Sequence, residues 1–307
     1  MKKRIMYIIL IINIIMLITL GIDYRFKVIT TTATDDEVKE RDVYLNIMAT
    51  NKMLYNMVKS ITADKHKVEY MFSQEQEQWN FEYTEDSINN LSKKDLFIYS
   101  GANYEPWAPD FIENIKKDKV GIINASRGTK ILYLSKPKKY NEKDIKENSY
   151  YWLSPDEFKV SLSNIKNSIQ ERDPKNRDYY EQNYVNRVKE LDSLTSKFKE
   201  TLKKIEDYNY IYIGEDFEYL IKYSSLKCTK INNNGDINTE KEKLIKKLEE
   251  NKNTAIIYGE EYELQAFREI INKHNIKLIK LYKECDGGYV ELFNKNLEAF
   301  NKFASEK

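Results

Sequence analysis

The sequence contains very little histidine, cysteine, glycine or proline: 2 His, 2 Cys, 9 Gly and 5 Pro among 307 residues. With two histidines, general acid–base catalysis would have to rest on carboxylates, and no spacing marks a carboxylate pair for that role. The sequence also has no glycine-rich phosphate loop and no Gly-x-Ser-x-Gly turn for a nucleophilic serine. These absences predict a protein that is not an enzyme and that carries no cofactor.

An excess of charge of either sign is also missing. The 50 Lys and Arg residues against 49 Asp and Glu residues give a net charge of +1. A nucleic-acid-binding protein normally shows a basic excess or a basic stripe, so we expect no nucleic-acid partner. The chain is long enough, and at 41% hydrophobic apolar enough, to build one large or two modest α/β cores.

The N-terminus carries the clearest single signal. Lys2, Lys3 and Arg4 precede an apolar run from Ile5 to Ile22, near the shortest length that spans a membrane. The basic flank orients this end toward the cytoplasm. No small-residue cleavage pattern follows the run, which favours an uncleaved anchor over a signal peptide. We therefore expect an anchor or signal segment over 1–22, a tether over 23–42, and a chain held on the extracytoplasmic face of the cell membrane.

The only two cysteines are Cys228 and Cys285. In an exported protein two cysteines can form a disulfide, yet their spacing carries no metal-binding signature. Both a Cys228–Cys285 bridge and two free thiols remain open at this point.

Beyond the tether, short apolar runs alternate with longer stretches of helical periodicity. This alternation predicts mostly parallel sheets with helices on both faces. Two series of such runs occur, one on each side of a continuous helical pattern. The fold class is therefore α/β, with two lobes joined by one long rigid helix, plus the N-terminal membrane helix. The expected limits are an N-terminal lobe over 43–175, a linking helix over 176–207 and a C-terminal lobe over 208–307.

Five motifs, in their order along the chain, resemble the zinc- and manganese-binding solute-binding proteins of ABC transporters, which include adhesin lipoproteins. The segment 91–97 resembles the family's "LSKADLF", and 105–107 resembles its "EPW". The segment 152–155 resembles "WLDP", 173–180 resembles the "DP…YY" opening of the long helix, and 289–298 resembles the terminal "YIEL…NLE". The resemblance covers nearly everything from Val43 onward.

The resemblance implies an extracytoplasmic binding component that works with an ABC-transporter permease in the membrane and binds a solute between its lobes. The family holds its metal on four side chains, chiefly His and carboxylates, which suit Zn²⁺ and Mn²⁺. At the matching positions this sequence has Trp79, Tyr150, Gly214 and Tyr282, and a shift of one residue would bring in Glu215 instead of Gly214. The two histidines, His66 and His274, are expected on exposed segments outside the site.

The inherited metal site is therefore expected to be lost, because tryptophan offers no lone pair and a phenol ionises only near pH 10. Several interpretations remain. Trp79, Tyr150 and Tyr282 could fill a dead cleft, could form with Glu215 an aromatic box for a ring or an organic cation, or could ligate ferric iron through tyrosine. A metal site away from the family's positions would use carboxylates from a further set of candidates: Glu75, Glu77, Glu215 and Asp286.

Two functional hypotheses follow. One is a transporter's binding component whose solute is altered or lost, with the small ligand unknown. The other is a surface-anchored interaction or accessory protein that keeps the fold without a ligand. The sequence does not decide between them.

Overall fold

The computed structural model describes residues 43–115, 119–232, 235–251 and 253–306. The predicted membrane segment and tether lie outside these residues. Within the described part of the chain, no helix combines the length and the apolar character needed to cross a membrane. Residues 43–307 group as one compact unit, and the limits predicted for its lobes and linking helix stay a prediction.

The N-terminal half contains a four-stranded parallel sheet in the order β2-β1-β3-β4. Its strands are β1 (Asn46–Asn51), β2 (Lys67–Phe72), β3 (Leu96–Tyr99) and β4 (Gly121–Asn124). The central strands β1 and β3 carry fully buried side chains such as Ile47 and Ile98, which is the pattern of a sheet covered on both faces. The helices of this half are α2 (Lys52–Thr62), α3 (Glu75–Trp79), α4 (Glu85–Leu91) and α5 (Ala108–Glu113).

The C-terminal half repeats this arrangement with a parallel sheet in the order β10-β9-β7-β8. Its strands are β7 (Asn209–Ile213), β8 (Cys228–Ile231), β9 (Thr254–Tyr258) and β10 (Lys277–Lys280). Its helices are α8 (Glu218–Ser224), α9 (Ile237–Glu250), the 3₁₀ segment Glu261–Phe267, α10 (Arg268–His274) and α11 (Tyr289–Ser305). We call the elements around the first sheet the N-terminal lobe and those around the second the C-terminal lobe.

Between the two sheets the chain forms a hairpin and two long helices. The antiparallel hairpin consists of β5 (Leu132–Tyr140) and β6 (Lys143–Asn148). A 3₁₀ turn (Tyr151–Leu153), α6 (Pro155–Arg172), a second 3₁₀ turn (Pro174–Asn176) and α7 (Arg177–Lys204) follow. Ser154 caps the start of α6 by accepting a hydrogen bond from the Glu157 N–H, and Pro155 occupies the first helical position, where no N–H is needed.

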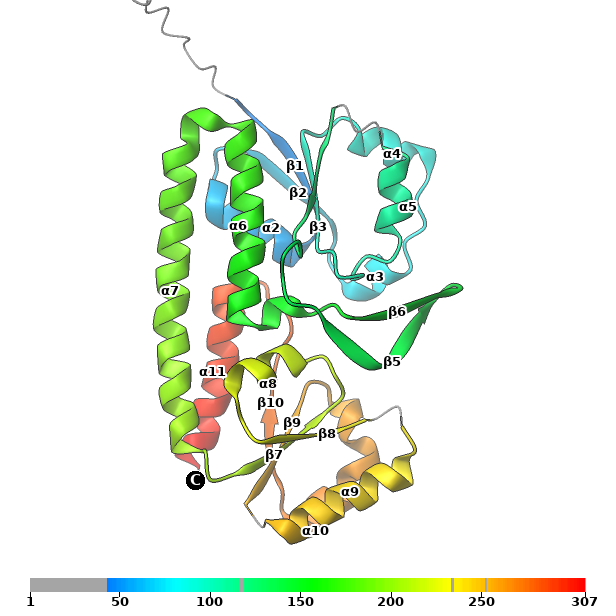
Figure 1. The fold of residues 1–307 in the computed structure, drawn as a ribbon, viewed down its shortest axis with the longest axis vertical. Coiled ribbons are helices and arrows are strands. Elements are labelled where there is room, and N and C mark those ends of the chain that lie inside the picture. The colour runs from blue at the N-terminus through cyan, green and yellow to red at the C-terminus, as the bar shows by residue number, and fades with distance from the viewer. Residues whose placement is uncertain (1–42, 116–118, 233–234, 252, 307) are drawn as a thin grey trace, which may run out of the picture. The chain divides into compact units, whose positions relative to one another are not determined.

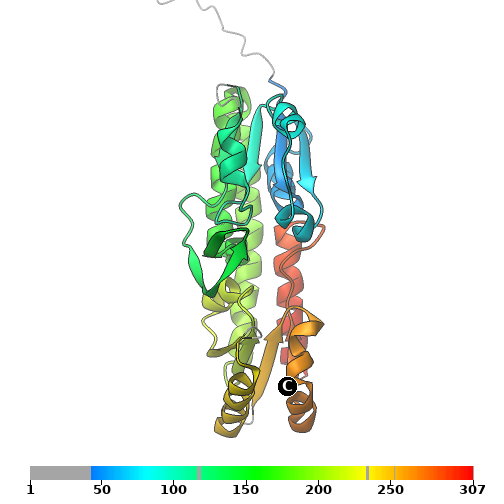
Figure 2. The same ribbon diagram turned by 90° about the vertical axis from the view of Figure 1, so that its right-hand side faces the viewer.

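Helix α7 has 28 residues and packs against α2 from the N-terminal half, against α6, which precedes it, and against α11 from the C-terminal half. Figures 1 and 2 both draw α7 and α11 side by side. Because this one helix contacts both halves, it connects them. The predicted α/β fold with parallel sheets and a long helix is confirmed.

The expectation that His66 is exposed is wrong. It precedes β2, and its side chain is fully buried with that of Asp173, because the turn packs beneath the start of α7. Its Nε2 lies 2.8 Å from the Tyr180 hydroxyl. His274 does lie exposed at the end of α10.

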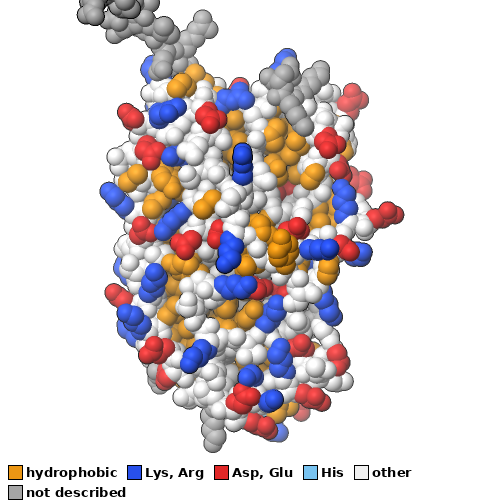
Figure 3. Space-filling model, in the orientation of Figure 1, with side chains coloured by type: hydrophobic (Ala, Val, Ile, Leu, Met, Phe, Trp, Pro, Cys, Tyr) orange, Lys and Arg blue, Asp and Glu red, His pale blue; other side chains and the backbone are white. Residues whose placement is uncertain are grey.

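The surface matches the balanced composition. On the face viewed in Figure 3, acidic and basic side chains are interspersed with apolar ones. No band of a single charge runs along that face, as a net charge of +1 leads one to expect.

Candidate functional site

The candidate site lies where the carboxyl ends of strands from both lobes face each other. Helix α3 follows β2, the loop of Gly214–Phe217 follows β7, and a loop of residues 281–288 follows β10. In sheets of parallel strands, ligands bind beyond the carboxyl ends of the strands. The loops that converge here therefore have the position of a ligand-binding site.

Two cavities occupy this region. The first, of about 410 Å³, is lined by Asn51, Glu75, Tyr104, Trp152 and Glu284 among others. The second, of about 600 Å³, lies beneath the β5–β6 hairpin and is lined by side chains from both lobes, including Lys138, Tyr150, Asp216, Glu263 and Lys283. Glu75 lines both cavities, so the two adjoin at this carboxylate.

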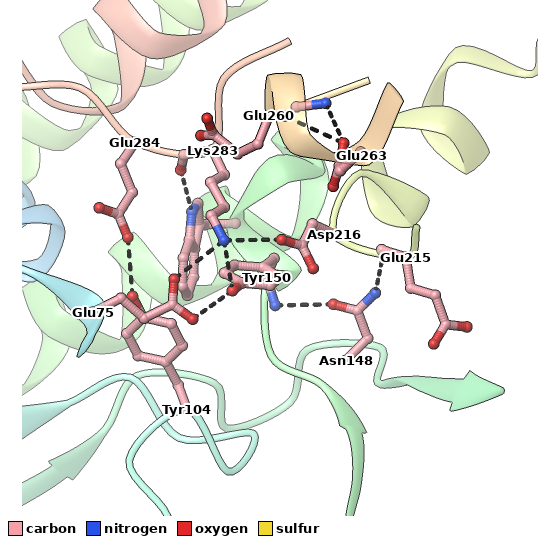
Figure 4. A network of polar contacts seen from close by, with 12 residues as sticks. Glu75, Tyr104, Asn148, Tyr150, Glu215, Asp216, Glu260, Glu263, Lys283 and Glu284 are labelled. Atoms are coloured by element: carbon pink, nitrogen blue, oxygen red, sulfur yellow. Dashed lines mark hydrogen bonds and ion pairs between the residues drawn. The ribbon is translucent and has the colours of Figure 1, made fainter. Parts of the chain in front are cut away.

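Lys283, in the loop after β10, lies at the centre of the site (Figure 4). Its Nζ is 2.8 Å from Asp216 Oδ2, 3.2 Å from Glu75 Oε2 and 3.0 Å from the Tyr150 hydroxyl oxygen. The Tyr150 hydroxyl in turn donates to Glu75 Oε1. Asp216 belongs to the C-terminal lobe and Glu75 to the N-terminal lobe, whereas Tyr150 belongs to the segment that connects the two sheets. One ammonium group therefore joins oxygen atoms of both lobes.

Partial burial and neighbouring carboxylates together determine the protonation states at the centre of the site. The side chains of Lys283, Glu75 and Asp216 are 27%, 31% and 29% exposed. Burial acts to lower the pKa of Lys283, but the carboxylates of Asp216 and Glu75 outweigh it and raise that pKa. Burial, together with the same two carboxylates, raises the pKa of Tyr150 well above its usual value. The site therefore holds an ammonium ion and a neutral phenol at neutral pH.

Neighbouring contacts fix the backbone that carries Lys283. The Trp152 indole N–H donates to the Lys283 carbonyl at 3.2 Å, and the Tyr104 hydroxyl donates to Glu284 at 3.0 Å. Asn296 pairs with both the N–H and the carbonyl of Tyr282. The Lys283 ammonium is thereby held at its position by hydrogen bonds on each side of the residue.

The predicted aromatic residues do not all meet. Tyr150 is buried at the centre of the site. Trp79 ends α3 half-buried, with its ring packed edge-on against Tyr140 of β5 at 5.4 Å. Tyr282 is not among the described residues that line the two cavities. The Lys295 ammonium lies over the Tyr282 ring, 3.6 Å from the ring centroid.

Glu215 points away from Lys283 (Figure 4). It forms an ion pair with Lys230 at 2.7 Å and accepts the Ser135 N–H at 2.8 Å. Although burial acts to raise the pKa of Glu215, these two partners lower it. Glu215 is therefore a carboxylate that already has its own cation, and its role as a ligand stays a prediction.

Of the other carboxylate candidates, only Glu75 belongs to the central cluster. Glu77 is exposed and accepts the backbone N–H groups of Ser73 and Gln74 at the start of α3. Asp286 is 93% exposed and pairs with Lys52. Among the described residues, no group of three or more His, Cys, Asp or Glu side chains is arranged to hold a metal ion.

Cys228 and Cys285 are both free thiols, so the disulfide is not formed. Cys228 begins β8, at one edge of the C-terminal sheet, whereas Cys285 follows β10, at the opposite edge. Three strand spacings of about 4.8 Å separate these edges, more than a disulfide can bridge.

Sequence reasoning missed Lys283 and Asp216. Both stand beside positions that the resemblance singled out, Lys283 after Tyr282 and Asp216 two residues after Gly214. A search for metal-binding residue types passes over a lysine. A basic residue next to a lost ligand position is the signal that could have found it.

The fold and the cleft between the lobes define a solute-binding protein of the kind that serves ABC transporters. Residues 47–303 match the family described as "ZnuA: Zinc-uptake complex component A periplasmic", and the chain belongs to this family.

Curated relatives agree with this assignment. The chain is 27% identical over 278 residues to the high-affinity zinc uptake system protein ZnuA of Bacillus subtilis, covering 83% of this chain and 86% of the relative. It is 27% identical over 205 residues to the manganese ABC transporter substrate-binding lipoprotein PsaA of Streptococcus pneumoniae, covering 64% of each chain.

Solved structures show the same fold. The metal-dependent lipoprotein YcdH of Bacillus subtilis matches with a TM-score of 0.68 and 23% identity, over 85% of this chain and 99% of that one. A mutant of FpvC from Pseudomonas aeruginosa matches with a TM-score of 0.70 and 20% identity, over 86% and 100%.

Proposed function

We propose that this chain is the extracytoplasmic solute-binding component of an ABC transporter, held at the outer face of the cell membrane by its N-terminal segment and docking on a membrane permease. The observation that carries this proposal is the family match over residues 47–303, together with a cleft between two parallel sheets. The names of the relatives, which include zinc and manganese uptake proteins, support metal transport as the ancestral role.

We further infer that the zinc or manganese site of the family no longer works in this chain. Gly214 has no side chain to offer, Tyr150 is held as a neutral phenol, and Tyr282 packs beneath Lys295. The ammonium of Lys283 at the centre would repel a second cation at this place. The donor set around Lys283 therefore does not fit Zn²⁺ or Mn²⁺ while that lysine is present.

The geometry also bears on the other ligands considered. An organic cation on the Tyr150 ring would meet the chain's own cations, because Lys283 and Lys138 lie 4.6 and 5.7 Å from the ring centroid. Ferric iron would need a Tyr150 phenolate, which burial disfavours. The same observation also supports the alternative of an accessory protein without a ligand. A cleft whose cation position is taken by its own lysine needs no solute.

Calorimetric titration of the detergent-solubilised full-length chain with Zn²⁺ and with Mn²⁺ tests the inference about metal. We expect no one-to-one site of sub-micromolar affinity for either ion. A stoichiometric tight site in the unmodified chain would show that the metal site survives.

The partner is tested by affinity capture of the tagged full-length chain from its own cells in mild detergent. Mass spectrometry should identify the permease subunit of an ABC transporter. Capture that yields no permease, while the chain itself is recovered folded, would favour the surface-anchored accessory protein.

A further inference from the structure

The cleft already contains a cation held in the manner of a bound ligand. The Lys283 ammonium has three oxygen partners within 3.2 Å, contributed by Glu75 of the N-terminal lobe, Asp216 of the C-terminal lobe and Tyr150 of the segment between the two sheets. An ammonium ion has three hydrogens to donate, so these partners satisfy it fully. Among the described residues, Lys283 alone forms ion pairs with carboxylates of both lobes.

We propose that Lys283 is a tethered substitute for the transported cation: its ammonium takes the cation position between the lobes and fastens them together without any free solute. This rests on the proposed function, because it assumes a cleft that descends from a cation-binding one. The cleft thus keeps its preference for a cation, and the Lys283 ammonium of the chain itself takes the place of that cation.

The charges around Lys283 support the proposal that its ammonium replaces a free cation. Two carboxylates, Glu75 and Asp216, face one ammonium, so removing that ammonium would leave two negative charges close together. Like charges at this separation, partly shielded from water, repel each other. An external cation would relieve the repulsion as the lysine does now.

The kind of cation follows from the donor atoms. The partners of the ammonium are oxygen atoms of two carboxylates and of a phenol. Oxygen donors suit alkylammonium ions and hard divalent ions such as Mn²⁺. A small amine or a hard metal ion is thus the ligand class for a cleft without Lys283.

Hydrogen bonds hold the loop that bears Lys283 at several points. Trp152 holds the Lys283 carbonyl, Tyr104 holds Glu284, and Lys52 and Asn56 hold the side chain and the carbonyl of Asp286. All four partners belong to the N-terminal half of the chain. The loop thus carries a row of contacts to the opposite lobe, with the ammonium as its innermost member.

The test is the full-length Lys283→Ala variant in detergent, compared with the parent by thermal unfolding and by calorimetric titration. The titrants are n-propylammonium, which has the atoms that the substitution removes, and Mn²⁺. We expect a lower melting temperature than the parent and recovery of part of that loss by either ion. The parent should not respond to n-propylammonium.

Lys52→Ala is the matched control. It removes one positive charge from another ion pair between the lobes, but its partner Asp286 is 93% exposed. Water fills the space that this substitution leaves, so neither ion should stabilise the variant. A Lys283→Ala variant that keeps the parent's melting temperature and gains no response to either ion would overturn the proposal.

A second variant covers the case in which Lys283→Ala does not fold. Lys283→Gln keeps most of the side-chain volume and removes only the charge. We expect it to fold and to gain affinity for Mn²⁺ relative to the parent, and equal affinities would contradict the proposal. If the parent itself binds Mn²⁺ or Zn²⁺ tightly, the proposed loss of the metal site fails. If neither the parent nor the Lys283 variants bind these ions, the proposed loss of the metal site stands and only the proposal for Lys283 is wrong.

Discussion

At the scale of single residues, a buried row of hydrogen-bonded side chains at the start of α7 has a defined protonation state. The Leu45 N–H donates to His66 Nδ1, and the Tyr180 hydroxyl donates to Asp173 Oδ2. His66 Nε2 lies 2.8 Å from the Tyr180 oxygen, so a neutral imidazole with its proton on Nε2 completes the row. Burial lowers the pKa of His66 against the opposing effects of Asp173 and of the hydrogen bond to the Lys65 backbone.

This row predicts a pH dependence of stability. The unfolded His66 binds a proton near pH 6.5, whereas the folded residue binds it only at lower pH. Its contribution is therefore present above about pH 6.5 and is lost as the pH falls below that value. The parent should lose thermal stability between pH 7.5 and 5.5, and His66→Gln should flatten that slope. His274→Gln, at the exposed histidine, should keep the parent's slope. Equal slopes for all three proteins would exclude His66 as the cause.

At the scale of elements, the long helix α7 depends on one narrow apolar stripe. Leu191, Phe198 and Leu202 are buried on it, seven and four residues apart, which places them on one face of the helix. Phe198 packs against Phe293 and Phe300 of α11 with ring centroids 5.4 and 5.3 Å apart. The contact between these two helices therefore centres on aromatic side chains.

Phe198→Ala should lower the free energy of unfolding by about 3–5 kcal/mol, the usual cost of removing a buried aromatic ring. Denaturant unfolding of the full-length chain measures it. Glu200→Ala on the exposed face of the same helix is the control and should change stability by less than about 0.5 kcal/mol. A small effect of Phe198→Ala would mean that the packing of α7 on α11 contributes little to stability.

The elements also show what the sequence could predict. Helix α7 and the buried strands β7 and β9 follow from long, regular apolar patterns. Strand β2 was missed, because it lies at the edge of its sheet and its residues Lys67–Phe72 are half-buried or exposed, which leaves no clear alternation. The ion cluster could not be predicted either. Glu75, Asp216 and Lys283 lie far apart in the sequence, and charged residues carry no periodic signal of which partner they meet.

At the scale of the whole molecule, the region of 43–307 combines two kinds of contact between its lobes. Helix α7 and the apolar core join them along one side. The Lys283 cluster joins them at the cleft, through Glu75 on one side and Asp216 on the other. Because one ammonium serves both carboxylates, the energetic effects of the two should depend on each other.

Glu75→Gln and Asp216→Asn, made singly and together, test this dependence by denaturant unfolding. Each single change leaves Lys283 with one carboxylate and removes the repulsion between the two, so each should cost little. The double change leaves the ammonium without either carboxylate that contacts it, so its cost should exceed the sum by about 0.5–3 kcal/mol. For the control, Glu69→Gln removes a partner of Lys94 inside the N-terminal lobe. Combined with Asp216→Asn, it should give additive costs within about 0.5 kcal/mol. Additivity in both pairs would mean that Lys283 does not connect the lobes energetically.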